Sequence, residues 1–586
     1  MGDNREIAAV FRQMGQALEI LGANRFRVLG NQRVARALKD MAQDVRGLVD
    51  EDPGTAVKRL SALDDIGKTS AQRIVEYLET GSIAEHADLL TKVPAGLFDL
   101  LELPGLGPKA VKLMWDDLGI DSLEKLEATP DETLAQLPRM GAKTVANLRK
   151  AVEWNRQAQG RLPLGLVRPL AFDLRDRLRA VPGVQRLELA GSLRRGRETL
   201  GDLDFLAVTE APEALRETFV GFDEVTEVLA RGDLKCSVRL ASGKVAIQAD
   251  LRLVPEASWG AALMYFTGSK QHNVRLREVA VQQGKRLNEY GLFEGTAERP
   301  QDAGLEPLAA ASEEEIYAEL GFDVVPPELR EDRGELDRPP VRLIEAADIR
   351  AELHAHTTAS DGRLSIEELA REAIRRGFHT LAVTDHSRSQ VIANGLSPER
   401  LWAHIDAVRE VNASLPEIEV LAGSEVDILA DGSLDYDDEL LAALDVVVAS
   451  PHAALRQSPE DATERLLAAI RHPLVHILGH PTGRILGKRE GLSPDMAALV
   501  AAAVEHDTAL ELNANWHRLD LRDSHLRLAL DRGCKIAIDT DAHDVPHFDF
   551  LDYGILTARR AGMAAESCIN TWPADRLLGW LRSKRP

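Results

Sequence analysis

The sequence predicts a multidomain protein with a helical N-terminal part, a mixed α/β middle and a C-terminal parallel β/α barrel. A chain of 586 residues is too long for one hydrophobic core and corresponds to roughly three to five domains. Glycine turns interrupt short amphipathic helical patterns over residues 1–160. From residue 346 onward, apolar β-rich runs alternate with helical patterns, near 349–353, 380–384, 419–423, 445–450, 475–479, 509–513 and 535–539. Such regular alternation is typical of a parallel, barrel-like fold.

The composition is that of a soluble globular protein. Hydrophobic residues make up 44% of the chain and aromatic residues 4%. The three cysteines, Cys236, Cys534 and Cys568, are far apart and show no CxxC spacing, so we expect neither a disulfide framework nor a thiolate zinc site. The N-terminus has no signal-peptide pattern, and no apolar run approaches the length of a transmembrane helix. We therefore expect a cytoplasmic protein that does not contact membranes.

Charge is distributed unevenly along the chain. The net charge of -23 is unexpected for a protein that binds nucleic acid, because phosphates are met by Lys and Arg. Residues 1–300, however, carry 42 Lys and Arg against 43 Asp and Glu, while the remainder carries 29 against 51. Of the 16 histidines, 14 follow residue 350. A solvated acidic surface would explain most of the carboxylates but not the histidines, and together they indicate ligands for divalent cations.

Three related glycine turns lie in the helical N-terminal part, each before a stretch rich in Ala, Val, Ile and Leu. Their residues are Gly67 and Lys68, then Gly105, Gly107 and Lys109, then Gly141 and Lys143. A glycine turn that opens a helix presents backbone N–H groups to an anion, which the helix dipole also favours. One such turn is typical of an ordinary helix connection, whereas three in series favour binding to the backbone of duplex or gapped DNA. They resemble helix-hairpin-helix motifs, with Asp65 and Arg139 replacing the leading glycine in the first and third copies.

Three aspartates in strand-like runs of the middle part indicate a metal site. Asp202 and Asp204 are two residues apart, which places them on one face of a strand, and Asp250 lies in a later apolar run. Crowded carboxylates repel unless cations bind between them, and two Mg²⁺ or Mn²⁺ ions there would activate a hydroxyl and stabilise a pyrophosphate leaving group. Ser192 and Arg195 follow Gly191 just upstream, where they can hold a triphosphate. A lone DxD would be typical of a solvated strand end, but the combination indicates a nucleotidyltransferase.

These motifs, followed by Tyr265-Phe266-Thr267-Gly268-Ser269, resemble the palm and thumb of the family X DNA polymerases. The resemblance implies that the three aspartates bind the two metal ions and that Gly191, Ser192, Arg195 and Gly201 form the triphosphate site. It also implies that Tyr265, Phe266 and Gly268 line the sugar pocket, and that Asn273 and Arg277 contact the minor groove and the template side. Lys270 departs from the vertebrate member, which has an acidic residue near the base, so we expect it to add a cation beside the nucleotide.

A second departure concerns deoxyribose-phosphate lyase chemistry. In the vertebrate member a lysine on the helix after the first glycine turn forms a Schiff base, and Arg73 occupies that position here. A guanidinium stays protonated and is a poor amine nucleophile. We therefore expect little lyase activity through this position, although Lys68 is nearby.

The histidine-rich part has nine candidate metal ligands, each directly after an apolar run. They are His354, His356, Asp361, His386, Glu425, His452, His480, Asp541 and His543. Side chains at the C-terminal ends of barrel strands converge on the face where barrel active sites lie. A single histidine there would more often be a packing or capping residue, but this whole set indicates a metal centre.

The nine positions resemble the polymerase and histidinol phosphatase (PHP) domain. The resemblance implies a distorted (β/α)7 barrel with three metal ions, Glu425 bridging them, and hydrolysis of phosphoesters. Imidazole and carboxylate ligands suit Mn²⁺, Zn²⁺ or Fe²⁺, and the sequence does not choose among them. The two resemblances divide the chain into a lyase-like helix-hairpin-helix domain (1–85), fingers (86–160), palm (161–255), thumb (256–325), linker (326–345) and PHP domain (346–586).

Together these features predict a monomeric, nucleoid-associated DNA repair polymerase. It would use dNTPs to fill short gaps on gapped or primer-template DNA, and its PHP domain would act as a 3′-5′ exonuclease or phosphoesterase, with nicking at abasic sites as a further candidate. One alternative is a template-independent terminal nucleotidyltransferase. Another is a DNA-end scaffold with a structural PHP domain, which missing ligands would have favoured. The nuclease substrate and the path of DNA between the two sites stay open.

Overall fold

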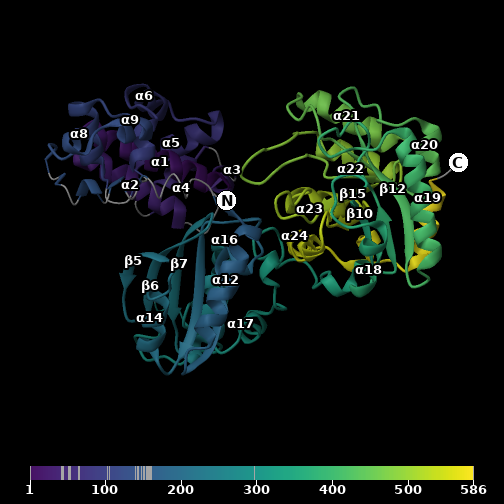
Figure 1. Ribbon diagram of the computed structural model, residues 1–586. Helices are drawn as coiled ribbons and strands as arrows, with labels where there is room; N and C mark the ends of the chain where they lie inside the picture. The colour runs from purple at the N-terminus through teal and green to yellow at the C-terminus, as the bar shows by residue number, and fades with distance from the viewer. Residues whose placement is uncertain are drawn as a thin grey trace. The chain divides into compact units, whose positions relative to one another are not determined.

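The computed structural model describes residues 2–40, 45–50, 54–63, 66–101, 103, 106–138, 140–141, 144–146, 148–149, 152, 161–295, 297 and 299–584. The chain separates into two compact units, Met1–Gln159 and Gly160–Pro586, and each is described by itself (Figure 1). None of the helices in these ranges combines the length and apolar character of a membrane span.

The first unit consists of helices around one hydrophobic core. They are α1 (Gly2–Ile20), α2 (Arg25–Asp40), α3 (Val45–Asp50), α4 (Ala56–Leu60), α5 (Lys68–Thr80), α6 (Ala84–Lys92), α7 (Gly96–Leu101), α8 (Pro108–Leu118), α9 (Leu123–Ala128) and α10 (Asp131–Leu134). The core extends from Ile7 to Val152, so the expected domains 1–85 and 86–160 share it. Helix α8 begins with a proline, whose fixed φ suits the first turn, and ends at Gly119 with a φ of 66°.

The second unit begins with the palm. Its sheet has the order β2 (Val184–Leu189), β4 (Asp202–Thr209), β7 (Val245–Leu253), β6 (Lys235–Ser242) and β5 (Val225–Arg231). Strands β4 and β7 are parallel, and the other neighbours are antiparallel. Helices α12 (Leu164–Arg179), α13 (Gly191–Arg194) and α14 (Pro212–Val220) and the short pair β1 (Leu162–Pro163) and β3 (Thr199–Leu200) complete it. Leu203 and Phe205 alternate with the aspartates and enter the core, which leaves the aspartates on the opposite face.

The thumb follows directly. It contains η1 (Glu256–Ser258), α15 (Trp259–Thr267), α16 (Lys270–Gln282), the hairpin β8 (Lys285–Asn288) and β9 (Gly291–Glu294), and α17 (Glu313–Leu320). The segment expected as a linker is packed: η2 (Pro327–Leu329) leads into Arg330, which is fully buried and pairs with Glu313 at 2.6 Å. Ile344 is also buried, and its N–H donates to the backbone oxygen of Met563. A buried ion pair and a backbone bond thus order this proline-rich connection.

The C-terminal part is a barrel of seven parallel strands in sequential order. They are β10 (Ala351–Ala355), β11 (Thr380–Val383), β12 (Glu419–Asp427), β13 (Val446–Ser450), β14 (Ile477–Leu478), β15 (Ala509–Asn513) and β16 (Ile536–Asp539). A bridge between Ala355 and Ala542 nearly closes the barrel between its first and last strands. The prediction of a distorted (β/α)7 barrel is confirmed, and each of the seven apolar runs coincides with a strand.

Helices surround this barrel on its outer side (Figure 1). They are α18 (Ile366–Arg375), α19 (Pro398–Ser414), α20 (Asp438–Ala443), α21 (Pro459–Arg471), α22 (Met496–Glu505), α23 (Asp523–Asp531), α24 (Leu551–Ala561) and α25 (Ala574–Ser583), with short turns η3 (Ala346–Asp348), η4 (Val545–Phe550), η5 (Ala565–Ser567) and η6 (Ile569–Thr571). Helix α18 shows how the sequence starts a helix, since Ser365 and Glu368 form a capping box.

Palm and barrel pack against each other within the second unit. The palm core includes Leu519 of the barrel. Trp516 lies so close to Gly165 that a Cβ at that glycine would be 2.1 Å from the indole Cγ. Arg484 pairs with Glu198 at 2.6 Å. Apolar and ionic contacts therefore hold the two parts together.

Two candidate active sites

The palm brings its three aspartates to one end of two parallel strands. Asp204 on β4 stands in register with Asp250 on β7, and Asp202 lies two residues before Asp204. Asp202 is exposed, Asp204 is half-buried and Asp250 is buried. The cluster is therefore open at one side and enclosed at the other, as a metal site that admits a substrate requires.

Two carboxyl groups of this cluster have pKa values that are shifted in opposite directions. Burial, followed by the charges of Asp202 and Asp250, raises the pKa of Asp204 to about 7. Burial would also raise the pKa of Asp250, but hydrogen bonds from Lys235 and Ser237 outweigh it and lower that pKa. Lys235 Nζ lies 2.6 Å from Asp250 Oδ2. A carboxyl group whose pKa is raised to near neutrality by burial and by its neighbours indicates a site whose charge is completed by bound cations.

The turn after β2 adjoins these carboxylates. Gly191 has a φ of 59°, and a Cβ there would lie 2.3 Å from Asp204 Oδ2, so only glycine fits. The buried Ser192 hydroxyl has no hydrogen-bond partner among the described residues, which leaves it available to a ligand oxygen. Arg195 Nη1 donates to the backbone oxygen of Thr267 at 2.5 Å, and Arg195 Nε to Glu331 at 3.1 Å. The turn is thus tied to the thumb.

The residues expected around the nucleotide sugar follow on α15 and α16. The rings of Tyr265 and Phe266 meet edge to face with centroids 5.1 Å apart. Asn273 Nδ2 donates to the backbone oxygen of Tyr265 at 2.7 Å, and Arg277 Nε to that of Asn273 at 3.2 Å. A Cβ at Gly268 would lie 3.1 Å from Arg195 Nη1, so this segment adjoins the turn of residues 191–196, which is predicted to hold the triphosphate.

Gly201 and Lys270 lie at the two ends of this arrangement. Gly201 precedes β4, and a Cβ there would lie 3.4 Å from Arg161 Nη1. Lys270 is exposed at the first position of α16. Both positions are consistent with a contact to an anionic substrate.

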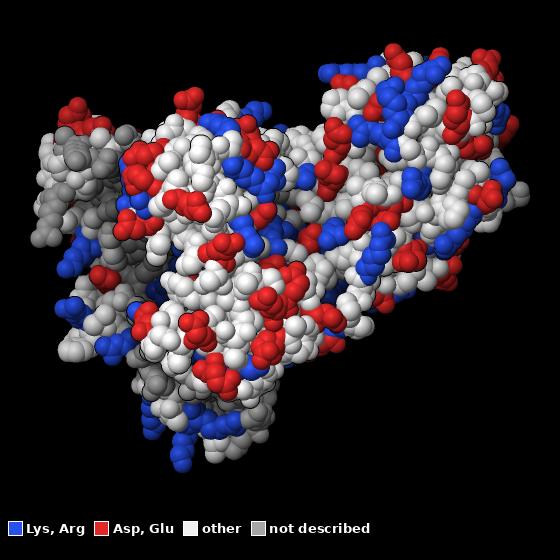
Figure 2. All heavy atoms as spheres, turned by 90° about the horizontal axis from the view of Figure 1, so that it is seen from below, with Lys and Arg blue, Asp and Glu red and all other residues white. Residues whose placement is uncertain are grey.

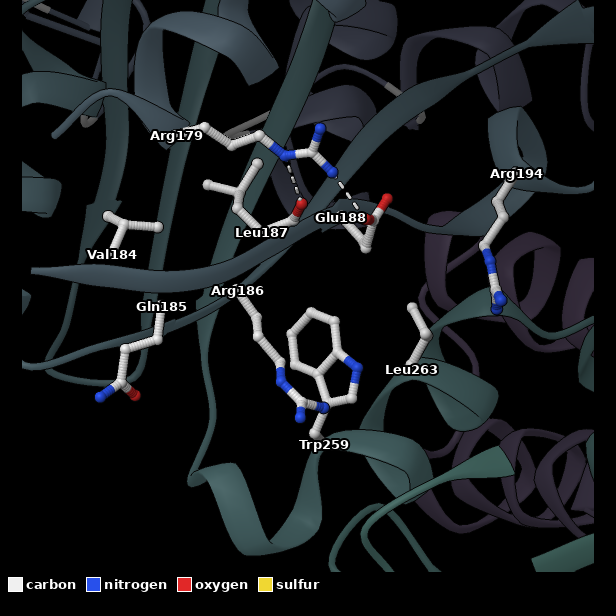
Figure 3. A pocket seen from close by; sticks show the side chains of 9 residues that line it. All are labelled: Arg179, Val184, Gln185, Arg186, Leu187, Glu188, Arg194, Trp259 and Leu263. Carbon is white, nitrogen blue, oxygen red and sulfur yellow. Dashed lines mark hydrogen bonds and ion pairs between the residues drawn. The ribbon is translucent and has the colours of Figure 1, made fainter. Parts of the chain in front are cut away.

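A hollow of about 620 Å³ on the palm surface was not predicted (Figure 3). Figure 3 shows Trp259 on its floor and three arginines around it. Arg179 donates to the backbone oxygen of Leu187 and to Glu188, at 3.0 and 2.6 Å. The Arg186 guanidinium lies 5.7 Å from the Trp259 ring. Because its cations are already engaged, the hollow is not a strong anion site.

The glycine turns of the first unit are exposed at helix starts. Gly67 caps α5 and Gly107 caps α8, and both are exposed with Lys68 and Lys109. The backbone oxygen of Gly141 accepts from Thr144 and Val145, as at a helix start. Gly105 and Lys143 lie outside the described residues.

The position expected for lyase chemistry forms an ion pair. Arg73 contacts Glu85, which also pairs with Arg27 at 2.7 Å. Burial, followed by the charge of Arg27, lowers the pKa of Arg73. A guanidinium committed to a carboxylate is not a nucleophile.

The barrel brings all nine predicted ligands together around Glu425. Glu425 Oε1 lies 2.8 Å from His480 Nε2 and 3.2 Å from His452 Nε2. Glu425 Oε2 lies 2.9 Å from His386 Nδ1, 3.4 Å from His354 Nε2 and 3.6 Å from His356 Nε2. Three groups have ligand atoms close enough for one ion each: His356, Asp361, His386 and His543; His354, His356 and Asp541; and His386, Glu425 and His452.

The donor atoms fit metal binding. Both Glu425 carboxylate oxygens and the nitrogens His354 Nε2 and His386 Nδ1 are buried and close to one another, but the angles of these contacts are not those of hydrogen bonds among the described residues. Buried polar atoms normally find partners, so such closely spaced orphans indicate a cation. Imidazole and carboxylate donors are those of Mn²⁺, Zn²⁺ and Fe²⁺ sites.

The ionisation of the cluster is correspondingly mixed. Burial would lower the pKa of His452, but Glu425 and Asp427 outweigh it and raise that pKa to about 9. Burial, followed by neighbouring cations, lowers the pKa of His356 and of His480 to about 4. Protons thus cannot neutralise all the carboxylates at once, whereas divalent cations can.

Second partners behind the ligands were missed in the sequence. Glu511 on β15 accepts from His354 Nδ1 at 2.6 Å, and Asp427 accepts from His452 Nδ1. Such carboxylates fix the imidazole tautomer and orientation. Asp427 lies two residues after Glu425 on one strand face, a spacing that could have indicated it, whereas Glu511 gave no comparable signal.

Family models match four segments of the chain. Residues 2–83 match a helix-hairpin-helix domain, 97–153 a SAM-like helix-hairpin-helix tandem, 262–331 the DNA polymerase beta thumb and 352–515 the PHP domain. These segments lie in the order that the sequence motifs predicted.

Relatives match either the whole chain or part of it. The chain is 36% identical to the DNA polymerase/3′-5′ exonuclease PolX of Bacillus subtilis over 569 residues, which cover 97% of each protein. It is 28% identical to a probable phosphatase of Thermoanaerobacter over 40% of this chain and 94% of that protein. A probable phosphatase of Caldanaerobacter subterraneus is 30% identical over 40% of this chain and 91% of that protein.

Proposed function

The chain belongs to the family X DNA polymerases that carry a PHP domain, and on that premise we propose how its two sites divide the work. It is a DNA polymerase with 3′-5′ exonuclease activity. The palm adds dNTPs to a primer end in short gaps, and the barrel hydrolyses the phosphodiester at a 3′ end. The observation that carries this proposal is that both ligand sets are complete and gathered, each within its own fold.

In the palm, the chain's residues bind and orient the reactants. Asp202, Asp204 and Asp250 would hold two Mg²⁺ or Mn²⁺ ions, which when bound would polarise the primer hydroxyl and neutralise charge on the triphosphate. Ser192 and Arg195 would bind triphosphate oxygens, and the segment from Tyr265 to Gly268 would line the sugar pocket. The orphaned Ser192 hydroxyl supports this assignment.

In the barrel, the nine ligands, Glu425 among them, would hold three ions of Mn²⁺, Zn²⁺ or Fe²⁺. When bound, the ions would supply an activated water and neutralise the scissile phosphate. Glu511 and Asp427 keep His354 and His452 oriented through their Nδ1 atoms. The 3′-terminal phosphodiester is the proposed substrate, and an abasic-site nick is a second candidate only because the same chemistry would serve it.

DNA is the macromolecular partner, bound through the exposed turns at Gly67, Gly107 and Gly141. Acidic and basic side chains are interspersed on the face shown in Figure 2, so this grip rests on backbone N–H groups and local lysines more than on overall charge. Neither ligand set needs a residue from a second chain, in keeping with the proposed monomer, and the DNA substrate is the reason to propose that it acts at the nucleoid in the cytoplasm.

The two rival functions have less support. A structural barrel would not need orphaned ligand atoms gathered around a buried glutamate. A template-independent transferase shares the palm chemistry, and primer extension against varied templates separates it from a template-directed enzyme.

One substrate tests the division of labour. Gapped DNA with a recessed 3′ end is incubated with dNTPs, or without them, using wild type, Asp202→Ala and His354→Ala. We expect Asp202→Ala to lose extension and keep 3′ hydrolysis, and His354→Ala to show the reverse. Hydrolysis at the wild-type rate by folded His354→Ala would contradict the assignment of the barrel.

A further inference from the structure

The barrel contributes a buried arginine to the back of the triphosphate turn. Arg560 on α24 donates through Nη1 to the backbone oxygen of Arg195 at 2.7 Å and to Glu331 Oε1 at 3.1 Å. It also grips Asp523 through Nε at 3.1 Å and Nη2 at 2.8 Å. Its side chain is only 3% exposed, so solvent does not screen these contacts as it screens surface pairs. One barrel side chain thus touches both the turn and the carboxylate that holds it.

That carboxylate, Glu331, is shared by three arginines. Its oxygens lie 3.1 Å from Arg195 Nε, 3.1 Å from Arg560 Nη1 and 3.5 Å from Arg197 Nη1. Burial would raise the pKa of Glu331, but Arg560, Arg195 and Arg197 outweigh it and lower that pKa. Arg195 therefore gives its Nε to Glu331, and a triphosphate oxygen that takes this donor must displace the carboxylate.

Releasing Arg195 would be costly if Glu331 were left without a cation, because a buried unpaired charge is strongly unfavourable. Arg560 and Arg197 still pair with the Glu331 carboxylate when Arg195 moves away, so its charge stays neutralised. We propose that Arg560 is a positioning residue of the polymerase site: it holds Glu331 so that Arg195 can exchange that carboxylate for the triphosphate of an incoming dNTP. The proposal rests on the triphosphate role of Arg195, and it makes the barrel a determinant of nucleotide affinity.

Helix α24 is packed tightly enough to act in this way. A Cβ at Gly554 would lie 2.6 Å from Ala514 Cβ on the barrel side. On the palm side, Leu556 Cβ lies 3.3 Å from the position of a Cβ at Gly196, the residue after Arg195. The helix is therefore packed between the barrel core and the triphosphate turn. This packing restricts the movement of Arg560, so its position relative to Glu331 is fixed.

The test compares Arg560→Met with Arg559→Met. Arg559 lies on the same helix but pairs with Glu328 at 2.7 Å, so its loss controls for damage to α24. Binding of the correct dNTP is measured as a Kd on a one-nucleotide gap with a dideoxy-terminated primer, and kcat on the same gap with a normal primer. We expect Arg560→Met to raise the Kd about tenfold with a much smaller change in kcat, and Arg559→Met to change neither.

A double-mutant cycle with Glu331→Gln separates this role from general support of the fold. Without the Glu331 charge, Arg195 has no carboxylate there to leave, and Arg560 keeps only its ion pair with Asp523, so Arg560→Met should change the Kd by no more than about twofold in that background. Equal effects of Arg560→Met with and without Glu331 would overturn the proposal. If Arg560→Met does not fold, Arg560→Lys carries the same cycle with a smaller rise. The Kd is measured without primer extension. An enzyme that bound dNTP but did not extend primers would therefore contradict the proposed function, while the effect of Arg560→Met on the Kd could still be measured.

An independent feature concerns the nuclease site. Val391 is 82% exposed and Ile392 103% exposed, and with Ala393 they form what we call the apolar tip, residues 391–393. Exposed apolar side chains that adjoin one another form a patch, and an apolar patch rimmed by polar residues is a typical mark of an interaction site. The tip follows His386, a predicted metal ligand, by only a few residues.

Both ends of the tip are fixed beside the metal site. Gln390 Nε2 donates to Asp427 Oδ2 at 2.6 Å, and the other oxygen of Asp427 accepts from His452. On the other side, Asn394 Nδ2 donates to the backbone oxygen of Ala359 at 3.1 Å, two residues before Asp361. The tip is thus held outward at the edge of the metal centre rather than free to fold back.

Basic residues flank the tip. Arg388 pairs through Nε with Asp435 at 3.1 Å but is 56% exposed, and Arg400 is exposed while donating to the backbone oxygens of Asn394 and Gly395. Apolar side chains inserted at a base step unstack it, and adjacent arginines hold the phosphates. We infer that the apolar tip separates the terminal base pair of a DNA 3′ end and delivers the freed strand to the metal site. This inference rests on the proposed nuclease function.

The test uses Val391→Ser/Ile392→Ser, with Val504→Ser, an exposed valine on α22, as control. Hydrolysis is compared on a single strand and on the same 3′ end in a duplex. We expect a fall of about tenfold on the duplex only, because only the duplex end has to be unstacked before hydrolysis. An equal fall on both substrates, or none on the duplex, overturns the inference.

A 2-aminopurine at the 3′ end reports unstacking without hydrolysis. Its fluorescence in the duplex should rise with wild type and with Val504→Ser, but not with the double variant. Unchanged fluorescence with wild type would overturn the role of the tip. Absence of hydrolysis with a normal fluorescence rise would instead contradict the nuclease assignment.

Discussion

Asp427→Asn should weaken the metal centre of the barrel without unfolding it. Asp427 is buried on β12, and its carboxylate accepts a hydrogen bond from His452 Nδ1. That bond leaves His452 Nε2, which lies 3.2 Å from Glu425 Oε1, as the nitrogen facing the cation, and it makes this nitrogen more basic. Asparagine has nearly the same size, so the substitution removes the charge and keeps most of the packing.

The expected size follows from the position of His452 in the centre. It belongs to the group with His386 and Glu425, so a poorly oriented imidazole removes one of three protein donors from that ion. Loss of a carboxylate behind a metal-binding histidine typically costs about 10- to 100-fold in metal affinity or activity. We expect 3′-end hydrolysis to fall by that factor, and gap filling to stay near the wild-type rate because the palm has its own carboxylates.

The assay is a Mn²⁺ titration of metal-stripped protein, together with both activities. Asp435→Asn is the matched control, because Asp435 is also buried and bonds to Arg388 and the Ser389 N–H but to no predicted ligand. It should bind Mn²⁺ like wild type. Wild-type Mn²⁺ affinity in Asp427→Asn, or an equal loss in both variants, would refute the reasoning.

Three further predictions concern the palm and the first unit. Asp204→Ala should lower dNTP addition at least about 100-fold while DNA binding, measured by anisotropy, stays nearly unchanged; substantial extension would contradict the two-metal assignment. Asp204→Asn should raise the melting temperature of metal-free protein at pH 7 more than at pH 4. The pKa of Asp204 is about 7 in the folded state and lower in the unfolded state, so the wild-type protein loses stability as the pH rises from the unfolded-state pKa to the folded-state pKa. An equal difference in melting temperature between the variant and wild type at both pH values would contradict this prediction. Borohydride should trap little Schiff base with a 5′-deoxyribose phosphate, and efficient trapping that survives Lys68→Ala and Arg73→Ala would reveal another amine.

Much of the fold could be predicted because its signals are local. Buried parallel strands are continuous apolar runs, and β10 to β16 coincide with the seven runs identified in the sequence. The aspartates at positions 202 and 204 share a strand face by spacing alone. Whether Asp250 lies beside them depends on which strands pair, and spacing alone does not show that. The resemblance to the polymerase family implied this pairing, and the register of β4 with β7 places Asp250 opposite Asp204.

The supporting contacts could not be predicted because no local signal carries them. Glu331 and Arg560 are 229 residues apart, and neither lies in a motif. The proline content indicated a linker at 326–345. A pattern of prolines does not show whether a residue of that segment, such as Arg330, has a buried partner, such as Glu313, elsewhere in the fold. Only Asp427, two residues after Glu425, had a spacing that could have placed it on the face of the ligands.

Separate ligand sets suggest two independent sites, but the packing between palm and barrel argues for a narrower statement. His452→Ala removes a metal donor and leaves Arg560, Glu331 and Arg195 untouched, so polymerisation should persist. A change at Arg560 removes no metal ligand of either site. It does remove one of the cations that pair with Glu331, the carboxylate that Arg195 is proposed to release when a nucleotide binds. If Arg195 binds the triphosphate as proposed, the two sites are independent in their metal chemistry but not in positioning, because helix α24, which carries Arg560, packs against the turn of residues 191–196.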